Sequence, residues 1–266
     1  MSSTVEYIIS DLHMCDKGPR DTFCLDGRLD RFNKFLDWVQ TKENYKITVL
    51  GDMLDFWRVN ISGSINAYKD ILDRLYFMHA VYVPGNHDNA FVNFLNTKTH
   101  LSHMLLEDAR TPYSKIIGGK EFTFLHGHEV DKYCKDNNPG IGNINVTISG
   151  LLADKNHSPI KDGKNIEDEL INALQFFNTL YLKIMHHPNS RTQTINDIED
   201  YRKSKNADVV IYGHTHEAGN IGTHHYNTGT WSRDVDTFAE ITDDGTVNLY
   251  VWTKDNKAIP FQHSLI

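Results

Sequence analysis

The sequence has few cysteines, no long apolar run and no excess of basic residues. Its three cysteines, Cys15, Cys24 and Cys134, cannot all pair and follow no Cys-x-x-Cys spacing. We therefore expect no disulfide scaffold and a reducing, cytoplasmic setting. No apolar run approaches the roughly 20 residues of a membrane span, so we expect no transmembrane segment, while peripheral membrane contact stays open. The net charge of −8 gives no strong signal for nucleic-acid binding.

What is present is an ordinary globular composition with an unusual number of histidines. Of the 266 residues, 39% are hydrophobic and 23% are charged, which is typical of a chain that buries a sizeable core. We expect a single domain over residues 1–266. Histidine is the outlier, with 15 residues, many of them in the motifs described below.

The first half of the chain alternates between strand-like and helix-like patterns. Short β-prone runs at 5–10, 46–50 and 80–83 are separated by apolar residues at helical spacing over 28–43 and 65–79. This order predicts a largely parallel sheet with helices on its faces.

Two more apolar runs, 121–125 and 207–212, repeat the strand pattern later in the chain. Beyond them, residues 224–253 have the pattern of short strands joined by an Asp244-Gly245 turn. We expect these short strands to form a second, mostly antiparallel sheet packed on the first.

Residues 129–206 interrupt this succession of strand-like and helix-like patterns. A Gly/Asn-rich stretch at 136–150 precedes apolar residues at helical spacing from about 167 to 186. We interpret the segment as a helical insertion. It either packs on the core, which is the favoured use, or caps the site, since insertions at this end of a sheet can line it.

Five acid and histidine motifs stand at the ends of apolar runs. They are Asp11-Leu12-His13, Gly51-Asp52-Met53-Leu54-Asp55, Gly85-Asn86-His87-Asp88, His126-Gly127-His128 and Gly213-His214-Thr215-His216. Ligands of open α/β sheets bind beyond the carboxyl ends of strands, so the positions suit a binding site. Carboxylate with neutral imidazole favours zinc, manganese or iron over calcium. A pair of such ions clamps the attacking and leaving oxygens of a displacement at phosphorus.

Each motif alone has a structural explanation, such as a turn at Gly51-Asp52 or a helix cap at Asn86. Their arrangement favours the metal interpretation. Residues i and i+2 of an extended strand end point the same way, so Asp11 and His13 can hold one ion. Gly51 allows a tight turn that places Asp52 between two ions, whereas Asp55 is better placed as an acceptor behind the ligands.

The order and wording of the motifs resemble the calcineurin-like metallophosphoesterase superfamily, over residues 10–216. The resemblance implies an α/β fold, a four-layer αββα sandwich of two mixed β-sheets flanked by helices, here with a helical insertion. It also implies two divalent metal ions. We expect manganese, with iron or zinc as alternatives.

The resemblance further assigns a role to each position. One ion would be held by Asp11, His13, Asp52 and His216. The other would be held by Asp52, Asn86, His126 and His214. His87 would be the catalytic histidine, paired with Asp55. A metal-bound hydroxide would hydrolyse a phosphomonoester, phosphodiester or pyrophosphate bond of a small phosphorylated substrate.

Other functions remain as alternatives. Asp11-Leu12-His13, Phe56-Trp57, His126-Gly127-His128 and the Gly-Thr-Trp ending of residues 227–231 resemble the branch containing UDP-2,3-diacylglucosamine pyrophosphatase. The enterobacterial type of that branch has arginine where this chain has His87, which favours a general phosphoesterase. A nuclease or cyclic-nucleotide phosphodiesterase is a second alternative. A non-catalytic scaffold, like the retromer subunit of this fold, is a third, and the intact ligand set argues against it.

Overall fold

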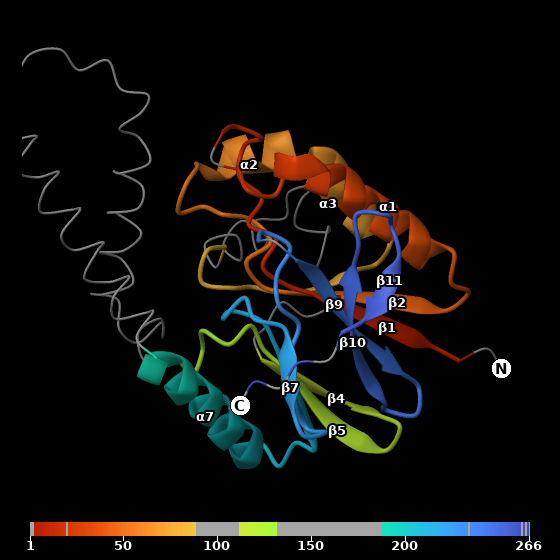
Figure 1. Ribbon diagram of the computed structural model, residues 1–266, viewed down its shortest axis with the longest axis vertical. Helices are drawn as coiled ribbons and strands as arrows, with labels where there is room; N and C mark the ends of the chain where they lie inside the picture. Colours follow the sequence, from red (N-terminus) through yellow and green to blue (C-terminus); the bar gives the residue numbers. More distant parts are fainter. Residues whose placement is uncertain are drawn as a thin grey trace, which may run out of the picture.

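Two β-sheets pack face to face, with helices on the outer face of each (Figure 1). The computed structural model describes residues 3–19, 21–88, 112–131, 188–233 and 235–261, together with His263 and Leu265. Both sheets contain parallel and antiparallel pairs, so the expected four-layer sandwich of mixed sheets is confirmed.

The first sheet has six strands in the order β11-β10-β9-β1-β2-β3. They are β1 (Val5–Ile9), β2 (Tyr45–Leu50), β3 (Val81–Val83), β9 (Asp236–Thr242), β10 (Val247–Trp252) and β11 (Ala258–Pro260). The predicted parallel trio β1, β2 and β3 forms one half of this sheet, because β2 pairs in parallel with both of the others.

The second sheet has five strands in the order β4-β5-β6-β8-β7. They are β4 (Tyr113–Ile117), β5 (Lys120–Phe124), β6 (Val209–Tyr212), β7 (Gly219–Ile221) and β8 (His225–Asn227). β5, β6 and β8 are parallel, and the outer strands β4 and β7 run antiparallel to their neighbours.

We had expected the strands of residues 224–253 to form the second sheet, but only β8 lies in it, and β9 and β10 belong to the first sheet. Instead, β9 pairs antiparallel with β1, from Val5 opposite Thr242 to Ile8 opposite Ala239, and thereby extends the first sheet. The second sheet is built around β5 and β6. We had described their apolar runs as repeats of the strand pattern that forms the parallel part of the first sheet. The alternation of apolar and polar residues along a strand indicates which of its faces are buried but not which strand lies beside it.

Helices cover both outer faces. Those on the first sheet are α1 (Arg28–Gln40), α2 (Ile61–Ala67) and α3 (Lys69–Phe77), with a short 3₁₀ turn, η1 (Leu25–Gly27), before α1. The predicted helix at 65–79 is divided at Tyr68, whose φ of −114° separates α2 from α3. On the second sheet, α7 (Pro188–Ser204) packs through Ile195 and Ile198.

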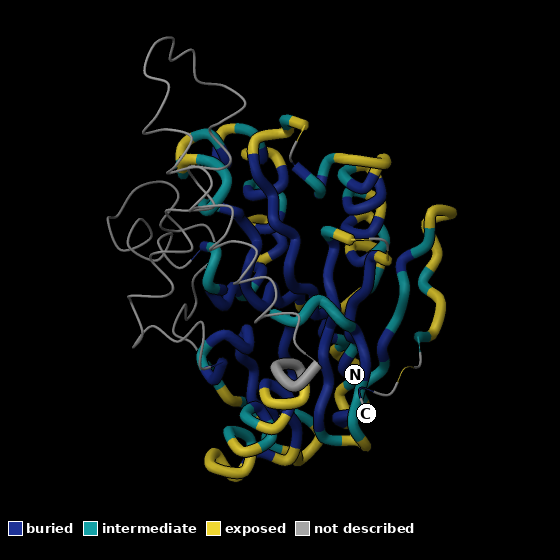
Figure 2. The backbone as a smooth tube through the Cα atoms, turned by 60° about the vertical axis from the view of Figure 1, so that its left-hand side comes forward, coloured by how far each residue is buried: buried dark blue, intermediate teal, exposed yellow. Residues whose placement is uncertain are grey.

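Buried residues follow the strands through the interior, while exposed residues lie on the outer sides of helices and at turns (Figure 2). Ile8, Leu50, Phe122 and Ile211 are among the side chains packed between the two sheets. The helix predicted at about 167–186 lies outside the described residues, and so does most of the insertion at 129–206. Among the residues described, no helix is long and apolar enough to cross a bilayer, and Cys15 and Cys24 are free thiols.

A buried ionic cluster joins α1 to the first sheet. Arg28 Nε donates to Asp236 Oδ1 at 2.7 Å, and Arg31 Nε donates to Asp236 Oδ2 at 2.9 Å. Arg31 also donates from Nη1 to the carbonyl oxygen of Asp26 at 2.6 Å. All three charged groups of the cluster are buried, so both guanidinium groups depend on one carboxylate for their compensating charge.

We predict that Asp236→Asn lowers the free energy of unfolding by about 3–5 kcal/mol, because it leaves two buried guanidinium groups without a negative partner. Urea unfolding followed by circular dichroism measures this change. Asp243→Asn, the same substitution at an exposed turn position, is the control and should change stability by less than about 0.5 kcal/mol. Equal effects of the two substitutions would contradict the role given to the cluster.

Candidate metal centre

The five motifs meet because each follows a strand at the same end of the sandwich. Asp11, Asp52, His126 and His214 each stand two residues after the last residue of β1, β2, β5 and β6. Asn86 stands three residues after β3. Motifs from both sheets therefore come together beyond the carboxyl ends of parallel strands.

The backbone turns sharply at these positions. Five of the predicted ligands have left-handed φ angles, namely Asp11 at 55°, His13 at 51°, Asp52 at 49°, His214 at 67° and His216 at 59°. We had expected the i and i+2 pairs to continue as extended strand, and that expectation is wrong. A left-handed residue costs roughly 1–2 kcal/mol, so the surrounding contacts must hold these side chains in place.

Four predicted ligands form a tight cluster. One ligand atom from each of Asp11, His13, Asp52 and His216 lies within 4.8 Å of the others. His216 Nε2 is 3.0 Å from Asp11 Oδ1 and 3.0 Å from His13 Nε2. His13 Nε2 is 3.7 Å from Asp52 Oδ2. These four residues are the set predicted for the first ion, and together they offer two carboxylates and two imidazoles.

The set predicted for the second ion is brought together only in part. His126 Nδ1 donates to the carbonyl oxygen of Leu50 at 2.7 Å, which leaves Nε2 facing Asp52 Oδ2 at 3.3 Å. Asn86 Oδ1 is buried and has no hydrogen-bonding partner among the described residues. His214 packs edge-on against the His126 ring, with 5.1 Å between the ring centroids.

His214 has a partner that the sequence did not reveal. Its Nε2 lies 3.1 Å from Asp131 Oδ2, so this nitrogen donates to the carboxylate and only Nδ1 is left to bind an ion. A carboxylate behind a histidine fixes the tautomer and the orientation of the ring, as is usual for metal-bound histidines. Asp131 lies five residues after His126, at a spacing that belongs to none of the five motifs.

The cluster is electrostatically suited to a cation. Burial alone raises the pKa of Asp11 and Asp52, but the neighbouring histidines outweigh burial and hold both pKa values well below the usual range. Burial lowers the pKa of His13, yet the nearby carboxylates of Asp11, Asp55 and Asp52 outweigh it and raise that pKa to about 10. Burial lowers the pKa of His216 to about 4, which keeps this imidazole neutral. The carboxylates are therefore ionised and favour positive charge between them.

The predicted pair His87 and Asp55 is in direct contact beside this cluster. His87 Nδ1 donates to Asp55 Oδ1 at 3.0 Å, and His87 Nε2 is 3.9 Å from Asp52 Oδ2. Asp55 is fully buried, and its second oxygen is 3.1 Å from Arg58 Nε and 3.5 Å from His13 Nδ1. Asp55 thus lies behind the cluster, as its spacing in the second motif had suggested.

Asp88 joins the second motif to the third. Its Oδ2 accepts hydrogen bonds from the backbone of Met53 at 2.7 Å and Leu54 at 3.1 Å, and its Oδ1 accepts one from Gly85 at 2.7 Å. Gly85 has no room for a side chain, because a Cβ atom there would lie 2.1 Å from Asp52 Oδ1. Asp88 was visible as the last residue of its motif, but no role had been assigned to it.

Residues 227–231 hold the first and last motifs together. Thr230 Oγ1 donates to the carbonyl oxygen of Asp11 at 2.8 Å, and Asn227 Nδ2 donates to that of Gly213 at 2.8 Å. Ser10 Oγ lies 2.8 Å from Thr228 Oγ1. The polar residues of this segment therefore hold the first and last motifs in place. The resemblance of the segment to one branch of a family did not indicate that role.

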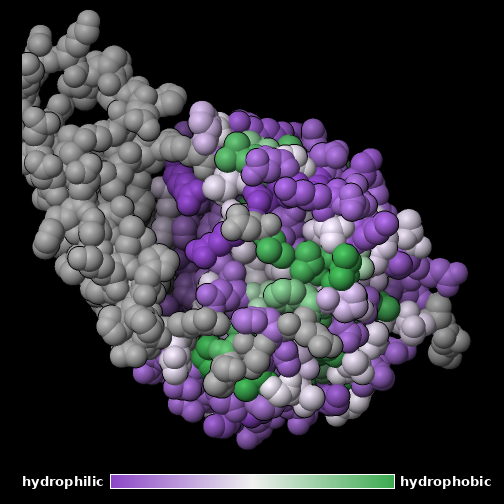
Figure 3. All heavy atoms as spheres, viewed as in Figure 1, coloured by the Kyte–Doolittle hydropathy of each residue, from purple (hydrophilic) through white to green (hydrophobic). Residues whose placement is uncertain are grey.

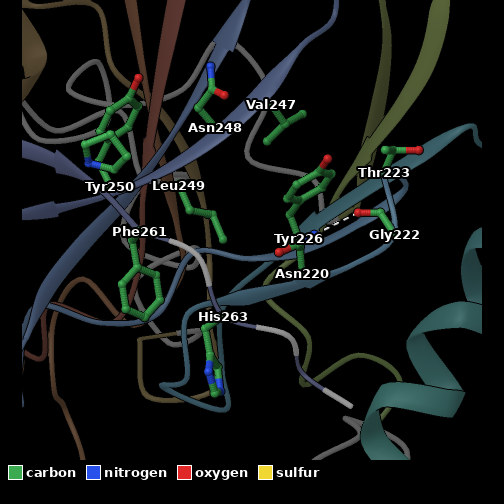
Figure 4. Close-up of a pocket in the computed structure, with 11 residues that line it drawn as sticks. Asn220, Gly222, Thr223, Tyr226, Val247, Asn248, Leu249, Tyr250, Phe261 and His263 are labelled. Carbon is green, nitrogen blue, oxygen red and sulfur yellow. Dashed lines mark hydrogen bonds between the residues drawn. The ribbon is translucent and has the colours of Figure 1, made fainter.

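Two cavities open near the junction of the sheets. On the face in Figure 3, hydrophobic atoms gather in the middle, where β7, β9 and β10 lie in Figure 1. The larger cavity, about 570 Å³, lies between residues of the β7–β8 hairpin, β10 and the C-terminal segment, and none of the predicted ligands lines it (Figure 4). The smaller one, about 300 Å³, is lined by His216 with Glu217, Val235 and Phe261 among others. Of these two cavities, both formed by described residues, the smaller one adjoins the candidate centre.

Comparisons with solved structures found similarity at low identity. A protein from Streptococcus pneumoniae described as a predicted phosphoesterase is 13% identical, with a TM-score of 0.41 and coverage of 98% of this chain and 96% of that one. Vps29 from Entamoeba histolytica in complex with zinc is 15% identical, with a TM-score of 0.47 and coverage of 98% and 99%. An archaeal phosphodiesterase is 14% identical, with a TM-score of 0.45 and coverage of 93% and 99%. At these values the similarities say nothing about activity.

No curated protein gives a significant match. A sequence profile of the calcineurin-like phosphoesterases matches residues 7–218, a stretch that includes all five motifs. The chain therefore belongs to the calcineurin-like phosphoesterase family.

Proposed function

We propose that this chain is a metal-dependent hydrolase that cleaves a phosphomonoester, phosphodiester or pyrophosphate bond. The observation that best supports the proposal is the buried convergence of Asp11, His13, Asp52 and His216 next to the separate pair of His87 and Asp55. A module that only binds a partner protein has no physical need for both a cluster of buried carboxylates and a histidine aligned by its own carboxylate.

The chemistry of the donor set fits two divalent ions. Asp11, His13, Asp52 and His216 would hold one ion, and Asp52, Asn86, His126 and His214 would hold the other. Two bound ions supply positive charge to the phosphoryl oxygens and lower the pKa of an attacking water. Mixed imidazole and carboxylate ligands favour manganese, iron or zinc, and we propose manganese first.

The side chains of the protein have their own tasks in this reaction. As the bond from phosphorus to the leaving oxygen breaks, His87 would give a proton from Nε2 to that oxygen. Asp55 accepts the hydrogen bond from Nδ1 of the same ring, which directs Nε2 toward the cluster. Asp131 keeps the His214 ring in one orientation, as a carboxylate behind a ligand does.

The cavity beside His216 bears on the size of the substrate. Its volume of about 300 Å³ is at the lower end of the range for small-molecule sites. Val235 and Phe261 supply apolar surface there, and Glu217 and His263 supply polar groups. We propose that the part of a small phosphorylated substrate that does not react occupies this space.

A panel of substrates tests the proposal. Manganese-loaded protein is assayed against a phosphomonoester, a phosphodiester, a cyclic nucleotide and a UDP-sugar conjugate, with iron-loaded and zinc-loaded protein in parallel. Hydrolysis of any of these substrates that disappears after chelation supports the proposal. Activity confined to the UDP-sugar conjugate favours the pyrophosphatase alternative. A complete lack of hydrolysis with every metal favours the scaffold.

We predict that Asp52→Ala loses most of its bound metal, because Asp52 is the only residue shared by the two proposed ligand sets. Metal content after dialysis against a limiting concentration of manganese, measured by elemental analysis, checks the prediction. Asp255→Ala, which removes an exposed carboxylate, is the control and should retain full metal content. Full metal content in Asp52→Ala would contradict the assignment.

We predict that His87→Ala keeps most of its metal but loses about 10²-fold or more in kcat, the usual scale for general acid–base assistance. Turnover and metal content are measured on the same preparations. If metal were lost in proportion to activity, His87 would be a ligand, and the role given to it here would be wrong.

A further inference from the structure

Residues 55–58 contact His87 from several directions. The indole of Trp57 stacks on the imidazole, with 3.7 Å between the ring centroids and 21° between the ring planes. The backbone nitrogen of Phe56 donates to the carbonyl oxygen of His87 at 3.3 Å. The backbone nitrogen of Trp57 donates to Asp55 Oδ1 at 3.2 Å, the oxygen that also accepts from His87. The stacked indole is the one contact in this group that acts on the flat face of the imidazole.

We propose that Trp57 is the positioning residue for His87, and that its indole sets the plane in which the imidazole presents Nε2 to the leaving oxygen. This proposal rests on the proposed function, because it gives Trp57 a part in the same proton transfer. The sequence marked Phe56-Trp57 only as a resemblance to one branch of the family, and it assigned no role to Trp57, which offers no metal ligand.

The geometry explains why a further contact is needed. The hydrogen bond from Nδ1 to Asp55 fixes one edge of the ring, and the His13 ring contacts it nearly at a right angle, with 4.6 Å between the ring centroids and 86° between the ring planes. Neither contact lies parallel to the imidazole, so neither covers its flat face. A parallel aromatic face within stacking distance restrains the plane of the ring, because any tilt brings the two rings into collision or opens a gap. Asp55 cannot follow a moving ring, since Arg58 Nε lies 3.1 Å from its other oxygen.

The fixed plane matters for the chemical step. When the bond between phosphorus and oxygen breaks, its electron pair stays on the leaving oxygen, and the proton on His87 Nε2 moves to that oxygen. The histidine side chain is 17% exposed, so a ring free to pivot could direct Nε2 toward solvent instead of the cluster. A misplacement of about 1 Å can cost on the order of 10²-fold in rate.

Trp57 is suited to a positioning role because it contributes little to the fold. It is half-buried and absent from the described core clusters, whereas its neighbour Phe56 packs against the first core. Replacing Trp57 therefore leaves the packing of the sandwich in place. Phenylalanine would keep a flat face against the imidazole, and alanine would remove it.

The kinetic test compares Trp57→Ala, Trp57→Phe and wild type, each loaded with manganese, on the p-nitrophenyl and phenyl esters of phosphate. Nitrophenolate is a weak base that leaves without a proton, whereas phenolate needs one. We expect Trp57→Ala to lose about 10-fold to 10²-fold in kcat on the phenyl ester and much less on the nitrophenyl ester, with KM and metal content unchanged. Trp57→Phe should recover most of the loss.

A second readout needs no activity. In carbon-edited proton NMR spectra, an indole stacked on His87 shifts the ring protons of that histidine upfield. The shift should disappear in Trp57→Ala. It should persist in Trp38→Phe, a control that removes a tryptophan of α1 stacked on neither His87 nor any other site residue.

The outcomes separate the two proposals. Equal losses on both esters, a change confined to KM, or no rescue by phenylalanine would overturn the role of Trp57 while leaving the phosphoesterase assignment intact. An upfield shift that is already missing in the wild type would also overturn it. If the wild type hydrolysed neither these esters nor any substrate of the panel with any metal, the proposed function would fail, and the positioning role would fail with it, even if the shift showed the stack to be present.

Discussion

The site depends on a backbone reversal at the ends of four strands. Asp11, Asp52 and His214 each leave a strand in the left-handed conformation, which sterics disfavour for residues other than glycine. Aspartate and histidine tolerate this conformation better than β-branched residues do. The reversal accompanies the meeting of their side chains beyond the carboxyl ends of the strands. His126 follows β5 and is itself followed by Gly127, whose φ of 124° is left-handed as well.

Backbone amides compensate for the burial of the carboxylates. The amide of His214 donates to Asp11 Oδ2 at 3.0 Å, and the amide of His87 donates to Asp52 Oδ1 at 2.8 Å. In each case a loop from one motif provides the hydrogen bond for the carboxylate of another. Since an unpaired buried charge is very costly, each loop is correctly placed only when its partner loop is also in place. This mutual dependence acts together with Leu12, Met53 and Leu54, which are buried in the first core, to maintain the strained backbone positions.

The sequence predicted β1, β2, β3, β5 and β6 and the meeting of the motifs, because an apolar run followed by a polar motif marks where a strand ends. It gave no prediction for β4, β7 or β11. It did not predict that β9 lies beside β1, since both faces of β9 are largely buried and would suit either sheet. The left-handed turn at Asp11 also escaped prediction, because nothing in Asp11-Leu12-His13 requires it. The roles of Asp131 and Trp57 were missed for a common reason. Each acts on a histidine through its position in space, and neither spacing nor residue type indicates such a partner.

The positive charge of Arg58 bears on which of two roles suits His87, that of a metal ligand or that of a proton donor. His13, Asp55 and His87 also form a group whose atoms lie within 4.8 Å of one another, so an ion could in principle sit there and take His87 out of proton transfer. Arg58 argues against that use, because its Nε lies 3.1 Å from Asp55 Oδ2 and already supplies positive charge to the carboxylate. A divalent ion on the same carboxylate would be repelled by the guanidinium. Among the described residues, no arginine or lysine forms an ion pair with Asp11, Asp52 or His216, although Arg233 acts on His216 from a greater distance. The Asp11 cluster is therefore better suited to an ion than the group around Asp55, which agrees with the proton-donor role proposed for His87.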